Sequence, residues 1–171
     1  MLSNAASGLR TLVVLACVAV VLVIAAAWGW HAMTRPFPGK ADAATCVDTT
    51  VHRGEQIFPA QVVVTVLNAS RREGLAGRTI SALTDQGFSA AGSGNAPGKS
   101  GVKRVQIWTT DPSNPAVRLV ASWLHRPTIV KKATTHPGVV VVVGQGFSEV
   151  SGGRKQVKVA HDTTICSPPV D

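Results

Sequence analysis

Residues 61–87 read QVVVTVLNASRREGLAGRTISALTDQG and carry the pattern that decides the fold. The β-branched run Val62–Leu67 ends at Asn68 and is typical of a buried strand, because branched side chains pack well on a pleated sheet. After a polar turn, apolar residues recur at helical spacing over Leu75–Gln86, and Gly87 follows as a helix-ending residue. This stretch therefore predicts a strand, a turn and an amphipathic helix.

The residues that follow predict the rest of a small sheet and a second helix. Alternating or apolar runs predict strands at Phe88–Ala91, Lys103–Trp108 and Val139–Val143, with a short extended piece at Thr128–Val130. Asn114 and Pro115 give a helix-start signal for a second helix over Ala116–Leu124. The order strand, helix, strand, strand, helix, strand predicts an α+β fold with a split βαβ (βαββαβ) core. Two right-handed crossovers place both helices on one face of the sheet.

An uncharged apolar stretch precedes the domain. Residues 11–30 match the roughly twenty residues that an α-helix needs to cross a bilayer, and Trp28 and Trp30 suit the headgroup layer. We expect a transmembrane anchor here rather than a buried soluble helix. Two alternatives remain open, namely a signal peptide cut after Ala27 and a lipoprotein signal with an acylated Cys17.

The anchor and the strand pattern divide the chain into five segments. These are a cytoplasmic N-terminus at 1–10, the anchor at 11–30, a linker at 31–60 with a short strand over Val47–Arg53, an α/β domain at 61–148, and a tail at 149–171 with a candidate edge strand over Gln156–Val159 and with Cys166. From their positions alone, the two flanking strands are expected to pair with each other.

Cys46 and Cys166 are the two cysteines outside the membrane segment, and they bracket the domain. They lack the close spacing of a metal or redox motif. We expect them to form a disulfide, which pairing of the flanking strands would favour; two unpaired thiols are the alternative. Because structural disulfides persist in oxidising compartments, the pair predicts a domain outside the cytoplasm.

Length, charge and motifs exclude several classes of protein. The 171 residues leave room for one modest domain, and 17 Lys and Arg against 9 Asp and Glu give a net charge of +8. No nucleophile elbow, zinc-binding helix motif or Walker loop is present, so no catalytic residue, metal or cofactor is predicted. Diffuse basic residues and the absence of Tyr argue against a nucleic-acid partner.

The turn between the first strand and the first helix is the candidate binding site. Asn68, Ser70, Arg71 and Arg72 stand where backbone N–H groups at a helix start point outwards, which suits a phosphate or carboxylate. The bland alternative, a solvated turn with a capping side chain, is favoured about two to one. A second basic group, Lys99, Lys103 and Arg104, is interpreted as part of a solvated loop.

Several short motifs, in order, resemble a known family. Val64–Ser70, Gly74-Leu75-Ala76 and Gly87-Phe88 resemble the opening of the LytR C-terminal domain, and Gly138–Phe147 resembles its ending, with Gly146 where an Asp is common. The layout of one membrane helix, Ala44-Thr45-Cys46 and a Cys near the end is similar to the Cei-type envelope integrity proteins of actinobacteria. In the family, this domain often follows a catalytic domain that attaches glycopolymers to peptidoglycan. The present sequence has no room for that catalytic domain.

The resemblance implies a non-enzymatic module that faces the cell envelope. We expect it to support envelope integrity by binding cell-wall glycopolymer, peptidoglycan or wall-biosynthesis proteins. The rival hypothesis is a hydrolase or transferase that acts on wall polymer through a site assembled only by folding. A third hypothesis is a structural partner within a membrane complex.

Overall fold

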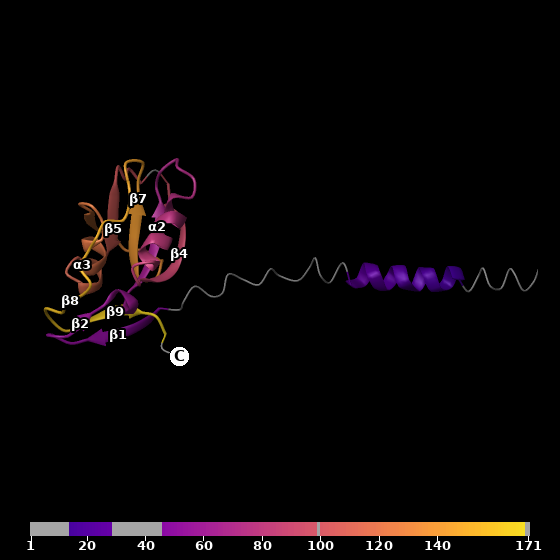
Figure 1. Ribbon diagram of the computed structural model, residues 1–171, viewed down its shortest axis with the longest axis horizontal. Coiled ribbons are helices and arrows are strands. Elements are labelled where there is room, and N and C mark those ends of the chain that lie inside the picture. The colour runs from indigo at the N-terminus through magenta and orange to yellow at the C-terminus, as the bar shows by residue number, and fades with distance from the viewer. Residues whose placement is uncertain (1–13, 29–45, 99, 170–171) are drawn as a thin grey trace, which may run out of the picture. The chain divides into compact units, whose positions relative to one another are not determined.

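The computed structural model describes residues 14–28, 46–98 and 100–169 (Figure 1). The chain separates into two compact units, Met1–Lys40 and Ala41–Asp171.

In the first unit, residues 14–28 form a helix whose large apolar side chains are exposed. No helix among the described residues has both the length and the hydropathy needed to cross a membrane. The predicted N-terminus at 1–10, the two ends of the predicted anchor at 11–30 and the linker up to residue 45 lie outside the described residues.

A mixed five-stranded sheet forms the centre of the second unit, in the order β4-β3-β7-β5-β6. Its strands are β3 (Val63–Asn68), β4 (Ser89–Asn95), β5 (Val105–Thr109), β6 (Thr128–Lys131) and β7 (Val139–Val143). β3 pairs in parallel with β4 and β7, β5 pairs antiparallel with β7, and β6 pairs in parallel with β5. Three parallel strands, β4, β3 and β7, therefore end at the same edge of the sheet, where β5 and β6 begin.

Two helices connect strands of this sheet. α2 (Leu75–Thr84) joins β3 to β4, and α3 (Pro115–Ser122) joins β5 to β6. As predicted, Asn114 caps α3 by accepting a hydrogen bond from the Ala116 N–H, and Gly87 after α2 has the positive φ (92°) that favours glycine. Both helices end two residues earlier than expected.

The predicted order of core elements is confirmed, but the split βαβ arrangement is wrong. In a split unit, a third strand lies between the two strands that a helix connects; here α2 and α3 each connect adjacent strands, and β7 lies between the two units. The reason is burial. All five valines of β7 are buried, which suits a central strand. The small and polar residues SAAGSGN of β4 suit the outermost strand of a sheet. The short piece expected at Thr128–Val130 is a full strand of the sheet, β6.

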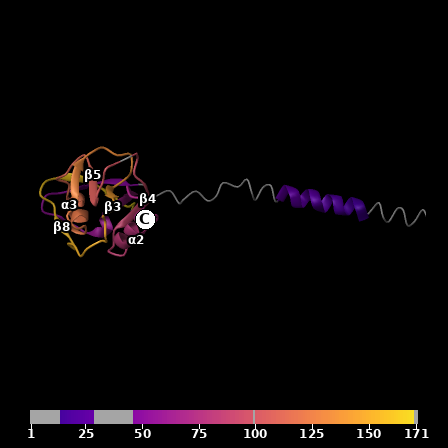
Figure 2. The ribbon, with the colours of Figure 1, turned by 90° about the horizontal axis from the view of Figure 1, so that it is seen from above.

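The two faces of the sheet are covered differently. α2 and α3 pack on the same face, as predicted, in one cluster with Val64, Ile107 and Val141 (Figure 2). A smaller cluster, which includes Trp108 and Val142, lies on the other face and has no helix over it.

Two small antiparallel ladders close the domain below the sheet (Figure 1). β1 (Val47–Val51) pairs with β9 (Thr163–Ser167), and β2 (Gln56–Ile57) pairs with β8 (Val157–Lys158). A short 3-10 helix, η1 (Pro59–Gln61), leads from β2 into β3. The strands predicted near residues 47 and 157 exist as β1 and β8, but the expectation that they pair with each other is wrong. β1 pairs with β9 and β8 pairs with β2, and neither of these partner strands was predicted. Val157 and Ile165 are buried in the main core, which ties the C-terminal segment into the domain.

Candidate functional site

The turn between β3 and α2, the predicted anion site, is held by hydrogen bonds of its own side chains. The Ser70 N–H and hydroxyl both donate to Asn68 Oδ1, at 2.9 and 2.8 Å. Asn68 Nδ2 donates to the Arg72 carbonyl oxygen at 2.8 Å, and the Arg72 N–H donates to Ser70 Oγ at 3.0 Å. These bonds explain why the short polar side chains Asn68 and Ser70 stand here, because such residues replace backbone partners in turns.

The two arginines of this turn have different surroundings. Arg72 is half-buried, and its guanidinium donates to the Phe147 carbonyl oxygen at 2.6 Å. Arg71 is exposed; its N–H donates to Gln145 Oε1 at 3.2 Å, and its guanidinium makes no hydrogen bond or ion pair with the described residues. The structure thus brings all four predicted residues together, but the N–H groups of Ser70, Arg71 and Arg72 already have partners.

A second turn, Gly144-Gln145-Gly146, connects this site to the basic residues Lys103 and Arg104. The Gly144 N–H donates to the Arg104 carbonyl oxygen at 2.6 Å, and the Gly146 N–H donates to the Lys103 carbonyl oxygen at 2.8 Å. A Cβ on Gly144 would collide with the Val102 carbonyl oxygen. The two glycines therefore allow close backbone contact in this turn.

Sequence reasoning treated Lys103 and Arg104 as a separate loop and gave no role to Gln145 or Arg126. The structure places Lys103 and Arg104 beside the predicted turn, because β5 begins at the edge where β3 and β7 end. Arg126, just before β6, lines the same surface pocket as Lys103 and Arg104. This neighbourhood is created by the parallel pairing of β3 with β7 and the antiparallel pairing of β5 with β7, which no local sequence pattern encodes.

The predicted disulfide lies in the β1–β9 ladder, beyond the opposite end of the five-stranded sheet. Cys46 and Cys166 are bonded, with their Cα atoms 5.3 Å apart. Beside Cys166 lies a pocket of about 210 Å³, lined among others by Trp108, Lys132 and Asn114. The Lys132 ammonium lies 3.5 Å from the centroid of the Trp108 ring, as in a cation–π contact. Because Trp108 is only 4% exposed, its ring does not offer an open stacking surface.

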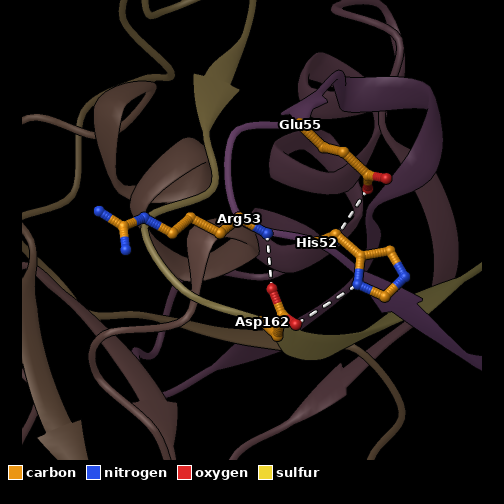
Figure 3. A network of polar contacts seen from close by, with 4 residues as sticks. All are labelled: His52, Arg53, Glu55 and Asp162. Carbon is orange, nitrogen blue, oxygen red and sulfur yellow. Dashed lines mark hydrogen bonds and ion pairs between the residues drawn. The ribbon is translucent and has the colours of Figure 1, made fainter.

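A polar network ties the turn after β1 to the turn before β9 (Figure 3). The Arg53 N–H donates to Asp162 Oδ1 at 2.7 Å, and His52 Nδ1 lies 3.5 Å from Asp162 Oδ2. The His52 N–H also donates to Glu55 Oε2 at 2.9 Å. The Arg53 amide, followed by the His52 side chain, lowers the pKa of the Asp162 carboxyl. This arrangement connects two turns, and the side chains of His52 and Asp162 are both largely exposed.

Asp111 occupies the turn before α3. The Ser113 hydroxyl and then the Ser113 N–H donate to its carboxylate and lower the pKa of Asp111. Within residues 14–28, 46–98 and 100–169, no group of three or more His, Cys, Asp or Glu side chains is placed to hold a metal ion.

These features describe an α+β domain with side-chain-bonded turns at one end of its sheet and a disulfide beyond the other. The profile of the family described as "LytR cell envelope-related transcriptional attenuator" matches residues 61–147, about half of the chain. The chain belongs to this family, which confirms the resemblance at that level.

One solved structure is also similar to this chain. It is the soluble domain of a conserved hypothetical secreted protein from Mycobacterium marinum, with 26% sequence identity and a TM-score of 0.43. The alignment covers 58% of this chain and 77% of that one. The comparison with curated proteins gives no match.

Proposed function

We propose that this chain is a membrane-anchored, non-enzymatic binding or scaffold module of the cell envelope, with its C-terminal domain outside the cytoplasm. Its partners in this proposal are cell-wall glycopolymer, peptidoglycan or wall-biosynthesis proteins. The finer resemblance to Cei-type envelope integrity proteins is part of the same proposal. Membership of the family supports the link to the cell envelope.

The disulfide is the observation that carries the extracytoplasmic part of the proposal. Cys46 comes directly before β1, and Cys166 lies within its partner strand β9, opposite Asp48. The bond therefore joins the residue just before the first strand of the domain to a residue of its last strand. Structural disulfides of this kind form and persist in oxidising compartments and are rare in the cytosol.

The helix over residues 14–28 supports the anchor. Its large apolar side chains between Val14 and Trp28 are 50–79% exposed. A continuous exposed apolar surface of this kind indicates contact with another apolar phase, such as the acyl chains of a bilayer.

The topology is tested by adding protease to intact spheroplasts of cells that carry the full chain with a C-terminal tag. We expect the tag and the domain to be digested while a cytoplasmic marker stays intact. Protection of the domain until the membrane is lysed would contradict the proposal.

Partner binding is tested with the full chain in neutral detergent micelles, incubated with purified peptidoglycan, wall glycopolymer and a membrane-protein extract. We expect enrichment of at least one of these over a chain whose domain has been denatured and reduced. Turnover of the wall material that a single side-chain change abolishes would instead support the hydrolase or transferase.

A further inference from the structure

We propose that four basic residues at the carboxyl end of β3 and β7, namely Arg71, Lys103, Arg104 and Arg126, form one binding edge for a linear polyanion that bears phosphate or carboxylate groups. We call these four residues the basic edge. The inference rests on the proposed function and deepens it, because it states which chemistry of a wall polymer the domain recognises and where.

Backbone contacts hold three of these residues together. The turn Gly144-Gln145-Gly146 binds the carbonyl oxygens of Lys103 and Arg104 through its two glycine N–H groups. In the same turn, the Gln145 side chain accepts a hydrogen bond from the Arg71 N–H. One Gln side chain and two backbone hydrogen bonds thus connect residues that are more than thirty positions apart in sequence.

A pocket of about 310 Å³ connects the fourth residue. It lies at the start of β5 and β6, and its lining includes Lys103, Arg104 and Arg126 together with Gln106 and Thr128. No Asp or Glu lines it. One planar guanidinium group can bind two oxygens of a phosphate or carboxylate at once. The Gln and Thr side chains of the pocket add neutral hydrogen-bonding groups.

The charges of the basic edge have no acidic partner. Among the described residues, the one ion pair is His52–Asp162, in the turns beside the β1–β9 ladder. Glu73 and Glu149, the acidic residues that flank these segments in sequence, make no ion pair with them. Like charges that gather without a counter-charge repel one another, and a bound anion relieves that repulsion.

The backbone of Arg126 adds an independent observation. It is the one residue other than glycine with a positive φ (49°) among the described residues, and Pro127 follows it. Such a conformation costs least for glycine, yet an arginine occupies the position and lines the pocket. Strained residues of this kind cluster at binding and catalytic sites.

The basic edge lies at the end of the five-stranded sheet opposite the disulfide. Cys46 is bonded to Cys166 of β9, and Ser167 of β9 donates a hydrogen bond to the Gln61 carbonyl oxygen just before β3. The basic edge lies past the other end of β3, about 20 Å away for a six-residue strand.

The test measures binding of fluorescent polyphosphate and poly-glutamate to the full chain in neutral detergent micelles, from 50 to 300 mM salt. The variant K103A/R104A/R126A is compared with R118A/K131A/K158A, which removes three exposed basic residues from α3, the far end of β6 and β8. Circular dichroism and thiol counting verify that both variants are folded and disulfide-bonded.

We expect the chain to bind at least one polymer, and K103A/R104A/R126A to lose at least tenfold in affinity at 100 mM salt. Its slope of log K against log salt should fall by about 2 for three lost contacts. The control should lose less than threefold. R71A alone should lose two- to fivefold. Equal losses in both triple variants would overturn the proposal, because they would indicate a diffuse charge effect.

Two further arms decide the identity of the anion. If inorganic phosphate binds as tightly as polyphosphate, the proposal of a polymeric ligand is overturned, because the site would then bind a single anion. Phosphatidylglycerol in the micelles that competes more strongly than either polymer would overturn it in favour of a membrane surface. If both polymers fail to bind while the chain still enriches peptidoglycan or a wall protein, this inference fails and the proposed function stands.

Discussion

The two ends of the five-stranded sheet are built by different means. Beyond one end, the Cys46–Cys166 disulfide holds the chain covalently and the β1–β9 ladder holds it by hydrogen bonds. At the other end, side-chain hydrogen bonds and close glycine contacts hold the turns that contain the basic edge. A covalent link stabilises the folded state wherever it lies in the structure. The opposite end can therefore carry basic side chains without acidic partners, because the fold does not depend on contacts of those charges.

The largest effect should come from removing the covalent link. Replacing Cys46 and Cys166 by Ser opens a loop with a sequence separation of 120 residues and should lower the free energy of unfolding by about 4 kcal/mol. Urea denaturation of the full chain in micelles measures this. Cys17→Ser, which removes a free, exposed cysteine, should leave stability unchanged. An unchanged midpoint in the double variant would show that the ladder alone closes this end.

Substituting the two glycines that flank β7 compares the stability of the two ends of the sheet directly. A Cβ on Gly138 would collide with the Val63 carbonyl oxygen, and Gly138 also has a positive φ (72°). Gly138→Ala should cost about 3 kcal/mol and Gly144→Ala about 2 kcal/mol, because backbone must move in both and only the first is strained. Gly152→Ala, where a Cβ meets nothing, should change stability by less than about 0.5 kcal/mol. A reversed order would contradict this account.

The two arginines of the β3–α2 turn should separate structure from binding. Arg72→Met removes a charged hydrogen bond to the Phe147 carbonyl oxygen and should cost about 1–2 kcal/mol. Arg71→Met should leave stability within about 0.5 kcal/mol, because its guanidinium has no bonded partner among the described residues. Thermal unfolding of the two variants measures the difference. Equal losses would show that Arg71 also holds the turn.

The smallest effect should be the pH dependence of the turns at the far end of the β1–β9 ladder. The pKa of Asp162 is lowered in the folded state, first by the Arg53 amide. Its carboxylate therefore stabilises the fold above about pH 4, and this contribution is lost as the pH falls through the lowered pKa. Asp162→Asn should lower the Tm at pH 6 but not at pH 2. Asp85→Asn is the control. A difference that is constant from pH 2 to pH 6 would contradict the assignment.

Much of the fold could be predicted from particular residues. The run Val62–Leu67, the five valines of β7 and the cap at Asn114 each encode their element locally, so all three were found. β9 was missed because TTICS alternates only weakly, and β4 was cut short because glycine and serine disfavour strands. The pairing of Cys46 with Cys166 followed from position and the number of cysteines.

The candidate site was predictable only in part. The composition of the β3–α2 turn identified Asn68, Ser70, Arg71 and Arg72 as neighbours, but not that the side chains of Asn68, Ser70 and Gln145 accept the turn's N–H groups. Gln145 makes its contact across 74 positions of sequence, and the residue order gives no sign of it.

Local sequence patterns were enough to predict both helices of the domain, most strands of its sheet and the cysteine pair, because strand and helix patterns depend on neighbours within a few residues. Only the tertiary structure decided that β7 lies between two βαβ units and that Arg71, Lys103, Arg104 and Arg126 share an edge. Strand order depends on which buried surfaces fit together across the whole chain, and that competition among long-range pairings leaves no mark on local composition.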